Sequence, residues 1–292
     1  MKNDASKTRR PMGKAGRILL SLVITAAVGF VDFYLSLPAL NPQSADFYTF
    51  LALLCIVYTI SIFLLSAKPG DNVVRTPKAK VREWLKFIKQ SCLPVGILFG
   101  VVVIVALVGQ IISLPIFRAA AYRDLLTVED GTFAQDISQI SFDKIPTLDR
   151  DSAEYLGDRQ MGTLSDMVSQ FEYSNDSTQI NYQGRPVRVA PIDYADLIKW
   201  FTNRSDGLPA YLIIDMVTQE AEVVRLDEGM KYTTAEHFGR YLPRHLRFHY
   251  PTFMFADPVF EIDEEGHPYW VCPRMVKTIG LFGGSDIQGA VL

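Results

Sequence analysis

Three long apolar runs dominate the first 117 residues of this 292-residue chain. They cover residues 18–37, 47–66 and 93–116. At about 1.5 Å rise per residue, each run is long enough to cross a hydrocarbon core of about 30 Å. No soluble core could cover three such runs in so short a stretch. The sequence therefore predicts three transmembrane helices, with Pro94 in the first turn of the third.

The charges divide the chain into a basic and an acidic part. Residues 1–117 contain 13 Lys and Arg against 5 Asp and Glu, whereas residues 118–292 contain 16 against 27, so the net charge of −3 separates into +8 and −11. The basic residues of the first part lie only in the tail 1–17 and the loop 67–92. Because Lys and Arg are retained on the cytoplasmic side, we expect the amino terminus inside and the region after the third span outside. The acidic region opposes nucleic-acid binding.

Three features of the membrane part each allow two interpretations. Thr8-Arg9-Arg10 resembles a twin-arginine export signal, or it is a positive-inside flank. Residues 81–89 of the loop form a basic amphipathic helix that lies on anionic lipid, or they continue the third span into the cytoplasm. Asp32 lies inside the first span. Its carboxylate either marks a proton or ion pathway or reaches interfacial water at the nearby outer end of the helix.

We expect two extracytoplasmic α+β units, at 118–228 and 229–292. In the first, Asp151 and Ser152 cap a short helix that Gly157 ends. Asp193 caps a second helix, whose apolar stripe packs on a hairpin of 211–216 and 221–225. This stripe consists of Tyr194, Leu197, Ile198 and Phe201. Strands are expected at 166–174, 179–182 and 185–190.

In the second unit, Thr233 and Glu236 predict a capping box for a helix that Pro243 kinks or ends. Residues 259–262 pair with 269–272 around an acidic turn at 263–266. The final residues, 287–292, form an apolar strand-like run without a polar end. This run indicates a fragment whose second unit is incomplete; the other interpretation is a natural terminus docked as an edge strand.

A family resemblance rests on the helix near 194–201 and the segment after it. That segment reads Tyr211-Leu212-Ile213-Ile214-Asp215-Met216-Val217-Thr218-Gln219-Glu220-Ala221-Glu222-Val223-Val224. It resembles a PepSY or cystatin-like unit, in which a helix packs on a small antiparallel sheet. The larger layout resembles uncharacterised membrane proteins of Gram-positive bacteria. The resemblance implies peptidase modulation or protein contacts outside the cell, and it supplies no catalytic motif.

Candidate sites for chemistry are few. His245 and His249, four residues apart, would share one helix face and could ligate a metal if a third ligand were near; the alternative is a pair of surface histidines. The turn Asp263–Glu265 could hold calcium weakly or be a solvated hairpin turn. The sequence contains neither a nucleophile elbow nor a phosphate-binding loop. Cys272 is the only cysteine after residue 117, so a disulfide within that region is impossible.

The resulting prediction is a membrane-anchored α+β protein with three transmembrane helices, followed by helix-on-antiparallel-sheet units outside the cytoplasm. Its expected function is binding, scaffolding or regulation in the bacterial cell envelope, with the lipid bilayer and an extracytoplasmic protein or peptide as partners and with no cofactor. One alternative is a transport or channel component that uses Asp32. Another is a cell-envelope enzyme whose site lies partly outside this chain.

Overall fold

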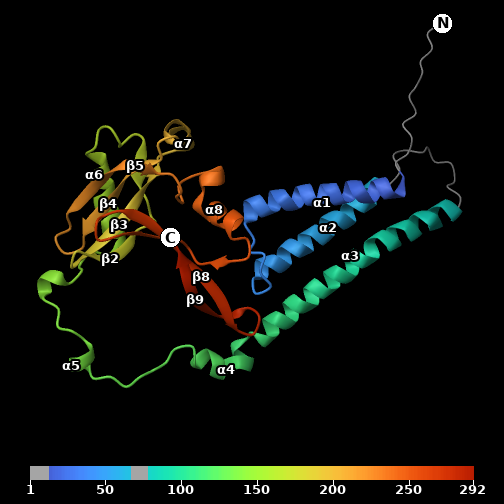
Figure 1. The fold of residues 1–292 in the computed structure, drawn as a ribbon, viewed down its shortest axis with the longest axis horizontal. Coiled ribbons are helices and arrows are strands. Elements are labelled where there is room, and N and C mark those ends of the chain that lie inside the picture. The colour runs from blue at the N-terminus through green and yellow to red at the C-terminus, as the bar shows by residue number, and fades with distance from the viewer. Residues whose placement is uncertain (1–12, 67–77) are drawn as a thin grey trace, which may run out of the picture. The chain divides into compact units, whose positions relative to one another are not determined.

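The structure is a computed structural model that describes residues 13–66 and 78–292 (Figure 1). It contains two compact units. The first, here called the membrane unit, comprises the chain up to Arg118 together with Ile279–Gly283. The second, the α+β unit, comprises Ala119–Thr278 and Gly284–Leu292. The segments 1–12 and 67–77 lie outside the described residues, and with them the Thr8-Arg9-Arg10 motif and most of the basic tail.

Three helices of the membrane unit are long and apolar enough to cross a membrane. They are α1 (Lys14–Ser36), α2 (Ala45–Ser66) and α3 (Lys78–Ile112). The 35 residues of α3 extend for about 52 Å, well beyond a hydrocarbon core of about 30 Å. Residues 78–92 therefore continue the third span, which is one of the two interpretations of that part of the loop.

The two ends of the third span differ from the prediction. Pro94 lies inside α3 rather than in its first turn, because the helix already begins at Lys78. The helix ends at Ile112, short of the expected residue 116. Pro115 instead begins a short helix, α4 (Pro115–Arg123), since proline has no N–H to lose in a first turn.

A returning segment, Ile279–Gly283, is packed against α3 within the membrane unit. The Ser113 hydroxyl accepts the backbone N–H of Leu281 and of Phe282, both at 2.9 Å, and donates to the Gly109 carbonyl at 2.6 Å. A Cβ on Gly109 would lie 2.6 Å from Leu281 Cδ2, so a larger residue there would require the Leu281 side chain to move. The Phe282 ring also meets the Tyr48 ring of α2 edge-on, with centroids 5.5 Å apart.

The α+β unit contains two antiparallel sheets. The first has the order β1-β3-β4-β5, with β2 also paired to β3, and the second has the order β6-β8-β7, with β9 paired to β8. The strands of the first sheet are β1 (Phe171–Tyr173), β2 (Thr178–Tyr182), β3 (Arg185–Tyr194), β4 (Leu208–Asp215) and β5 (Ala221–Met230). Those of the second are β6 (Met254–Phe255), β7 (Val259–Ile262), β8 (Pro268–Ile279) and β9 (Gly283–Val291).

Short helices connect and cover these sheets. They are α5 (Phe133–Asp136), η1 (Phe142–Lys144), α6 (Arg150–Gly162), α7 (Leu197–Asn203), η2 (Phe238–Arg240) and α8 (Leu242–His249). Helix α6 packs on one face of the first sheet, where Ile192 of β3 and Leu212 of β4 point. The second sheet and α8 cover the opposite face, where Val189 and Tyr211 point. Because side chains alternate along a strand, β3 and β4 are buried on both faces.

Both sheets therefore share one core inside a single unit. The boundary expected at 228/229 falls within β5, which continues to Met230, so it does not separate two units. The expected hairpins are present. Val259 pairs with Val271 and Ile262 with Pro268 around the acidic turn, and Leu212 pairs with Val223 in the β4–β5 hairpin. The terminal run 287–292 lies largely in β9, which pairs with β8.

Four local predictions about helices are wrong. Gly157 does not end a helix: α6 is capped by Asp149, which accepts the Ser152 N–H at 2.7 Å, and Gly157 lies inside it against the Tyr173 ring. Pro243 does not break a helix but lies in the first turn of α8. The other two concern the Asp193 cap and the Thr233–Glu236 capping box, which belong to the site described next.

Candidate functional site

Helix α7 exposes the stripe that was expected to be buried. Asp193 and Tyr194 remain in β3, where they pair with Glu172 and Phe171 of β1, so the helix begins only at Leu197 and is capped by Asp196. Leu197, Ile198 and Phe201 are 64%, 74% and 64% exposed. The prediction that this stripe covers the sheet is therefore wrong. The position of α7 is instead fixed by Trp200, which is 5% exposed.

Trp200 is held by a buried carboxylate. Its indole N–H donates to Glu236 Oε2 at 2.8 Å, and the Tyr194 hydroxyl donates to Glu236 Oε1 at 2.9 Å. Glu236 is 1% exposed, so these two donors replace the water that a carboxylate otherwise needs. Burial, together with the neighbouring Glu236, raises the pKa of the Tyr194 hydroxyl.

The expected capping box is therefore absent, because Glu236 serves residues far away in the sequence. Thr233 is also buried, and its carbonyl accepts the Leu242 N–H at 3.0 Å. The chain between them makes the single turn η2 rather than a regular helix. This loop is thereby fixed next to α7.

A pocket of about 390 Å³ opens between α7 and η2. The Arg204 guanidinium lies over the Phe201 ring, 4.6 Å from its centroid, and 5.4 Å from the centroid of Trp200. The ring of Phe238, which is 62% exposed, also lies next to Trp200, with ring centroids 5.7 Å apart. The lining residues are Trp200, Arg204, Ser205, Glu236, His237, Phe238, Gly239 and Arg240. We call this pocket and the exposed Leu197, Ile198 and Phe201 the α7 surface.

The chemistry of the α7 surface is aromatic and basic. Arg204 and Arg240 bring two permanent cations to the pocket, and Arg240 also donates to the Arg204 carbonyl. The buried Glu236 also lines the pocket, and each of its carboxylate oxygens accepts a hydrogen bond. Such a surface suits an apolar group next to an anionic one, because aromatic rings and arginines are the residues enriched in binding interfaces.

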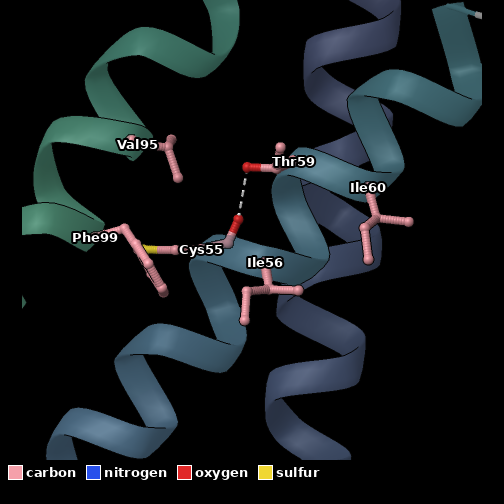
Figure 2. Close-up of a pocket in the computed structure, with 7 residues that line it drawn as sticks. Cys55, Ile56, Thr59, Ile60, Val95 and Phe99 are labelled. Carbon is pink, nitrogen blue, oxygen red and sulfur yellow. Dashed lines mark hydrogen bonds between the residues drawn. The ribbon is translucent and has the colours of Figure 1, made fainter. Parts of the chain in front are cut away.

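A second hollow lies between two helices of the membrane unit (Figure 2). It has a volume of about 260 Å³ and is lined by Cys55, Ile56, Thr59 and Ile60 of α2 and by Val95, Gly96 and Phe99 of α3. The Thr59 hydroxyl donates to the Cys55 carbonyl of its own helix at 2.8 Å, as the dashed line in Figure 2 marks. All seven lining residues are uncharged, so this hollow offers apolar contacts of the kind that lipid chains make.

His245 and His249 share one face of α8, as their spacing predicts. Their ring centroids are 4.1 Å apart, the Tyr232 ring lies 4.3 Å from His245, and His249 Nδ1 lies 2.8 Å from the His245 carbonyl oxygen. Burial, together with His249, lowers the pKa of His245. Within 13–66 and 78–292, no third ligating side chain joins this pair.

Asp263, Glu265 and His267 of the acidic turn do bring three potential ligand atoms within 4.8 Å of one another. Asp263 Oδ1 accepts the backbone N–H of His267 at 2.7 Å and of Glu265 at 3.1 Å, and its Oδ2 lies 3.1 Å from His267 Nδ1. The backbone bond from His267 lowers the pKa of Asp263 most. These bonds hold a tight hairpin turn, and the loop lacks the alternating oxygen ligands of a calcium site.

Asp32 accepts a hydrogen bond from the Ser36 hydroxyl, one turn later in α1, at 3.0 Å. The side chain thus finds a polar partner within its own helix near the end of the span.

Compared with known protein families, with curated proteins and with solved structures, the chain has no significant match. The resemblance to PepSY or cystatin-like units therefore remains an expectation. The arrangement in the α+β unit does include a helix on an antiparallel sheet, but the packed helix is α6 and not the segment 194–201.

Proposed function

We propose that this protein is a membrane-anchored binding or scaffolding protein of the bacterial cell envelope, whose α+β unit engages a protein or peptide partner through the α7 surface. The observation that carries the proposal is the exposure of four large apolar side chains around a pocket with two arginines. Burying one such side chain contributes about 1.5–3 kcal/mol, so a partner that covers all four gains several kcal/mol.

Several further observations support binding rather than catalysis. Both oxygens of Glu236, the carboxylate in the pocket, accept hydrogen bonds from Trp200 and Tyr194. Glu236 thus holds these two side chains in place, which is a structural role. The three apolar helices would keep the unit at the membrane, and the positions of Lys and Arg favour its location outside the cytoplasm. A resemblance to PepSY or cystatin-like units, which modulate peptidases, favours the same class of function.

The proposal is tested by site-specific photo-crosslinking of the full chain in intact cells. A photoreactive residue at position 198 should give crosslinked adducts, whereas one at position 287, another exposed apolar site, in β9, should give none above background. The substitution Phe201→Glu should abolish the adducts from position 198, because a carboxylate in the apolar stripe cannot be buried against a partner. Equal labelling from both positions, or labelling that Phe201→Glu leaves unchanged, would refute the proposal.

A further inference from the structure

The hollow between α2 and α3 suits hydrocarbon rather than water. Figure 2 shows Val95 and Phe99 of α3 on one side of it and residues of α2 on the other. The one hydroxyl in its lining, on Thr59, donates to the Cys55 carbonyl of the same helix. A buried water needs two or more polar partners, which this lining does not supply. Within a membrane, the hollow is therefore filled by an apolar chain.

The hollow lies at the depth that acyl chains of one leaflet reach. Its α2 residues, 55–60, lie 6 to 11 residues before the end of that helix at Ser66, which is about 9–16 Å along the axis. One leaflet contributes about 15 Å to a hydrocarbon core of about 30 Å. Trp84 of α3 donates its indole N–H to the Ser66 carbonyl at 2.9 Å, and tryptophan is enriched at membrane interfaces. A lipid with its head group at the level of Trp84 can thus place a chain in the hollow.

Gly96 opens the α3 side of the hollow. A Cβ on Gly96 would meet no atom within 4 Å, so there is free space next to the helix at this point. Gly100, one turn further along, is equally open but does not line the hollow. A second helix that packs against a Gly-x-x-x-Gly face would use both glycines, and it is about 10–12 Å across with its side chains. The hollow therefore fits a single flexible chain better than a helix.

Two cations lie between Gly96 and the interface. Arg82, Lys89 and Gly96 are spaced seven residues apart, which is nearly two turns, so they lie on one side of α3. Both basic side chains are exposed. Side chains of a helix tilt toward its N-terminus, which for α3 is the direction away from the middle of the bilayer. With Lys89 about 10 Å from Gly96 along the axis, the two cations lie where a phosphate above the hollow would be.

Acidic residues do not cancel this positive charge. All 13 Lys and Arg before residue 118 lie in 1–17 and 67–92, and these two segments contain only three acids, Asp4, Asp71 and Glu83. Glu83 is the only acid of α3, against five Lys and Arg. Among residues 13–66 and 78–292, no carboxylate pairs with Arg82 or Lys89. This end of the membrane unit therefore has a net positive charge that an anionic ligand can neutralise.

We infer that the hollow between α2 and α3 is a binding site for an anionic phospholipid. One acyl chain lies over Gly96 between Ile56 and Phe99, and Arg82 and Lys89 hold the phosphate of the head group. The chain supplies apolar contacts, and the cations supply selectivity, because a zwitterionic lipid brings the same chain without a net charge. The inference is independent of the α7 surface and of which side of the membrane the amino terminus occupies.

Photoreactive phospholipids test the inference with the full-length protein in phosphatidylcholine vesicles. A phosphatidylglycerol probe with a diazirine midway along one chain should label residues 55–60 and 95–99. A phosphatidylcholine probe with the same chain should label them about tenfold less. The pair Arg82→Gln and Lys89→Gln should reduce labelling by the phosphatidylglycerol probe to the level of the phosphatidylcholine probe. Gly96→Leu should remove the labelling by both probes, because the leucine side chain takes the place of the acyl chain.

Each variant has a matched control. The pair Lys14→Gln and Arg17→Gln removes two cations at the start of α1, which packs on α2, and should leave the labelling unchanged. Gly100→Leu adds the same side chain to α3 outside the hollow and should also leave it unchanged. A decrease in labelling with either control that matches the decrease with its variant would overturn the inference.

Two further results would overturn it. One is equal labelling by the two probes, or labelling by the phosphatidylglycerol probe that persists when Arg82 and Lys89 are both replaced. The other concerns a different occupant. Native mass spectrometry of protein released from the vesicles should find phosphatidylglycerol retained on single chains. A dimer that Gly96→Leu dissociates would instead assign the hollow to a second copy.

Discussion

At the scale of single residues, the buried Glu236 has the clearest energetic consequence. Glu236→Gln keeps one acceptor but places an NH₂ group against one of its two donors, the Tyr194 hydroxyl or the Trp200 N–H. We expect a loss of about 1–3 kcal/mol in the free energy of unfolding, because one buried polar contact is then unsatisfied. Thermal unfolding of the full chain in detergent, followed by tryptophan fluorescence, measures the loss. Glu222→Gln on β5 is the control; an equal effect there would contradict the role of Glu236.

Asp193 should make stability depend on pH. It lies on β3 directly opposite Glu172 of β1. Burial raises its pKa to about 6; a hydrogen bond with Ser174 lowers the pKa by less, and the nearby Asp176 and Glu172 add smaller increases. Because the folded-state pKa exceeds the unfolded value near 3.9, the unfolded state ionises first as pH rises. Asp193 therefore lowers stability progressively between about pH 4 and 6 and by a constant amount above that range.

The corresponding variant is Asp193→Asn, which should raise the free energy of unfolding at pH 7 by about 1–3 kcal/mol and change it little at pH 4. Unfolding at both pH values measures the difference. Asp227→Asn, at an exposed position, should give no such dependence on pH. A benefit of Asp193→Asn that is equal at both pH values would show that ionisation of Asp193 is not its cause.

At the scale of elements, the two glycines of α6, Gly157 and Gly162, differ in how closely other atoms pack against them. A Cβ on Gly157 would lie 2.3 Å from Cδ2 of the Tyr173 ring, whereas one on Gly162, in the same helix, would meet nothing within 4 Å. Gly157→Ala should therefore destabilise the protein by about 1–3 kcal/mol, despite the better helix propensity of alanine. Gly162→Ala should be neutral or stabilising by up to about 1 kcal/mol. If unfolding measurements give both variants the same sign, α6 does not pack as described.

Sequence periodicity predicted some helices and strands correctly and others wrongly. It located the three apolar helices and the hairpins 211–225 and 259–272, where length and alternation leave few alternatives. It gave α7 the wrong start and the wrong buried face, because pairing of Asp193 and Tyr194 with β1 extends β3 and leaves only Trp200 to anchor the helix. The Trp200–Glu236 bond could not be predicted, since it joins residues 36 apart without a local motif.

At the scale of the whole molecule, the number of spans governs where the α+β unit lies. Three helices that are long and apolar enough to cross a membrane would bring the amino terminus and the region after Ile112 to opposite sides of the bilayer. Which side each occupies depends on the charges of the flanks, and every Lys and Arg before residue 118 lies in the tail 1–17 or in 67–92. The short connection between α1 and α2 contains neither residue type, as expected for an outer loop.

We therefore expect the tail and residues 67–92 in the cytoplasm and the α+β unit outside. Protease added to intact protoplasts should remove the α+β unit and spare 67–92, whereas lysed protoplasts should lose both. An epitope tag at the amino terminus, protected until lysis, provides the matched control for membrane integrity. The seven Lys and Arg of 67–92 supply much of the positive charge that sets the orientation of the helices in the membrane. Replacing them all with Gln and adding Lys residues to the loop 38–44 should therefore weaken or invert that orientation. Cleavage of 67–92 in intact protoplasts that still protect the tag would contradict this topology, since the two basic segments would then lie on opposite sides.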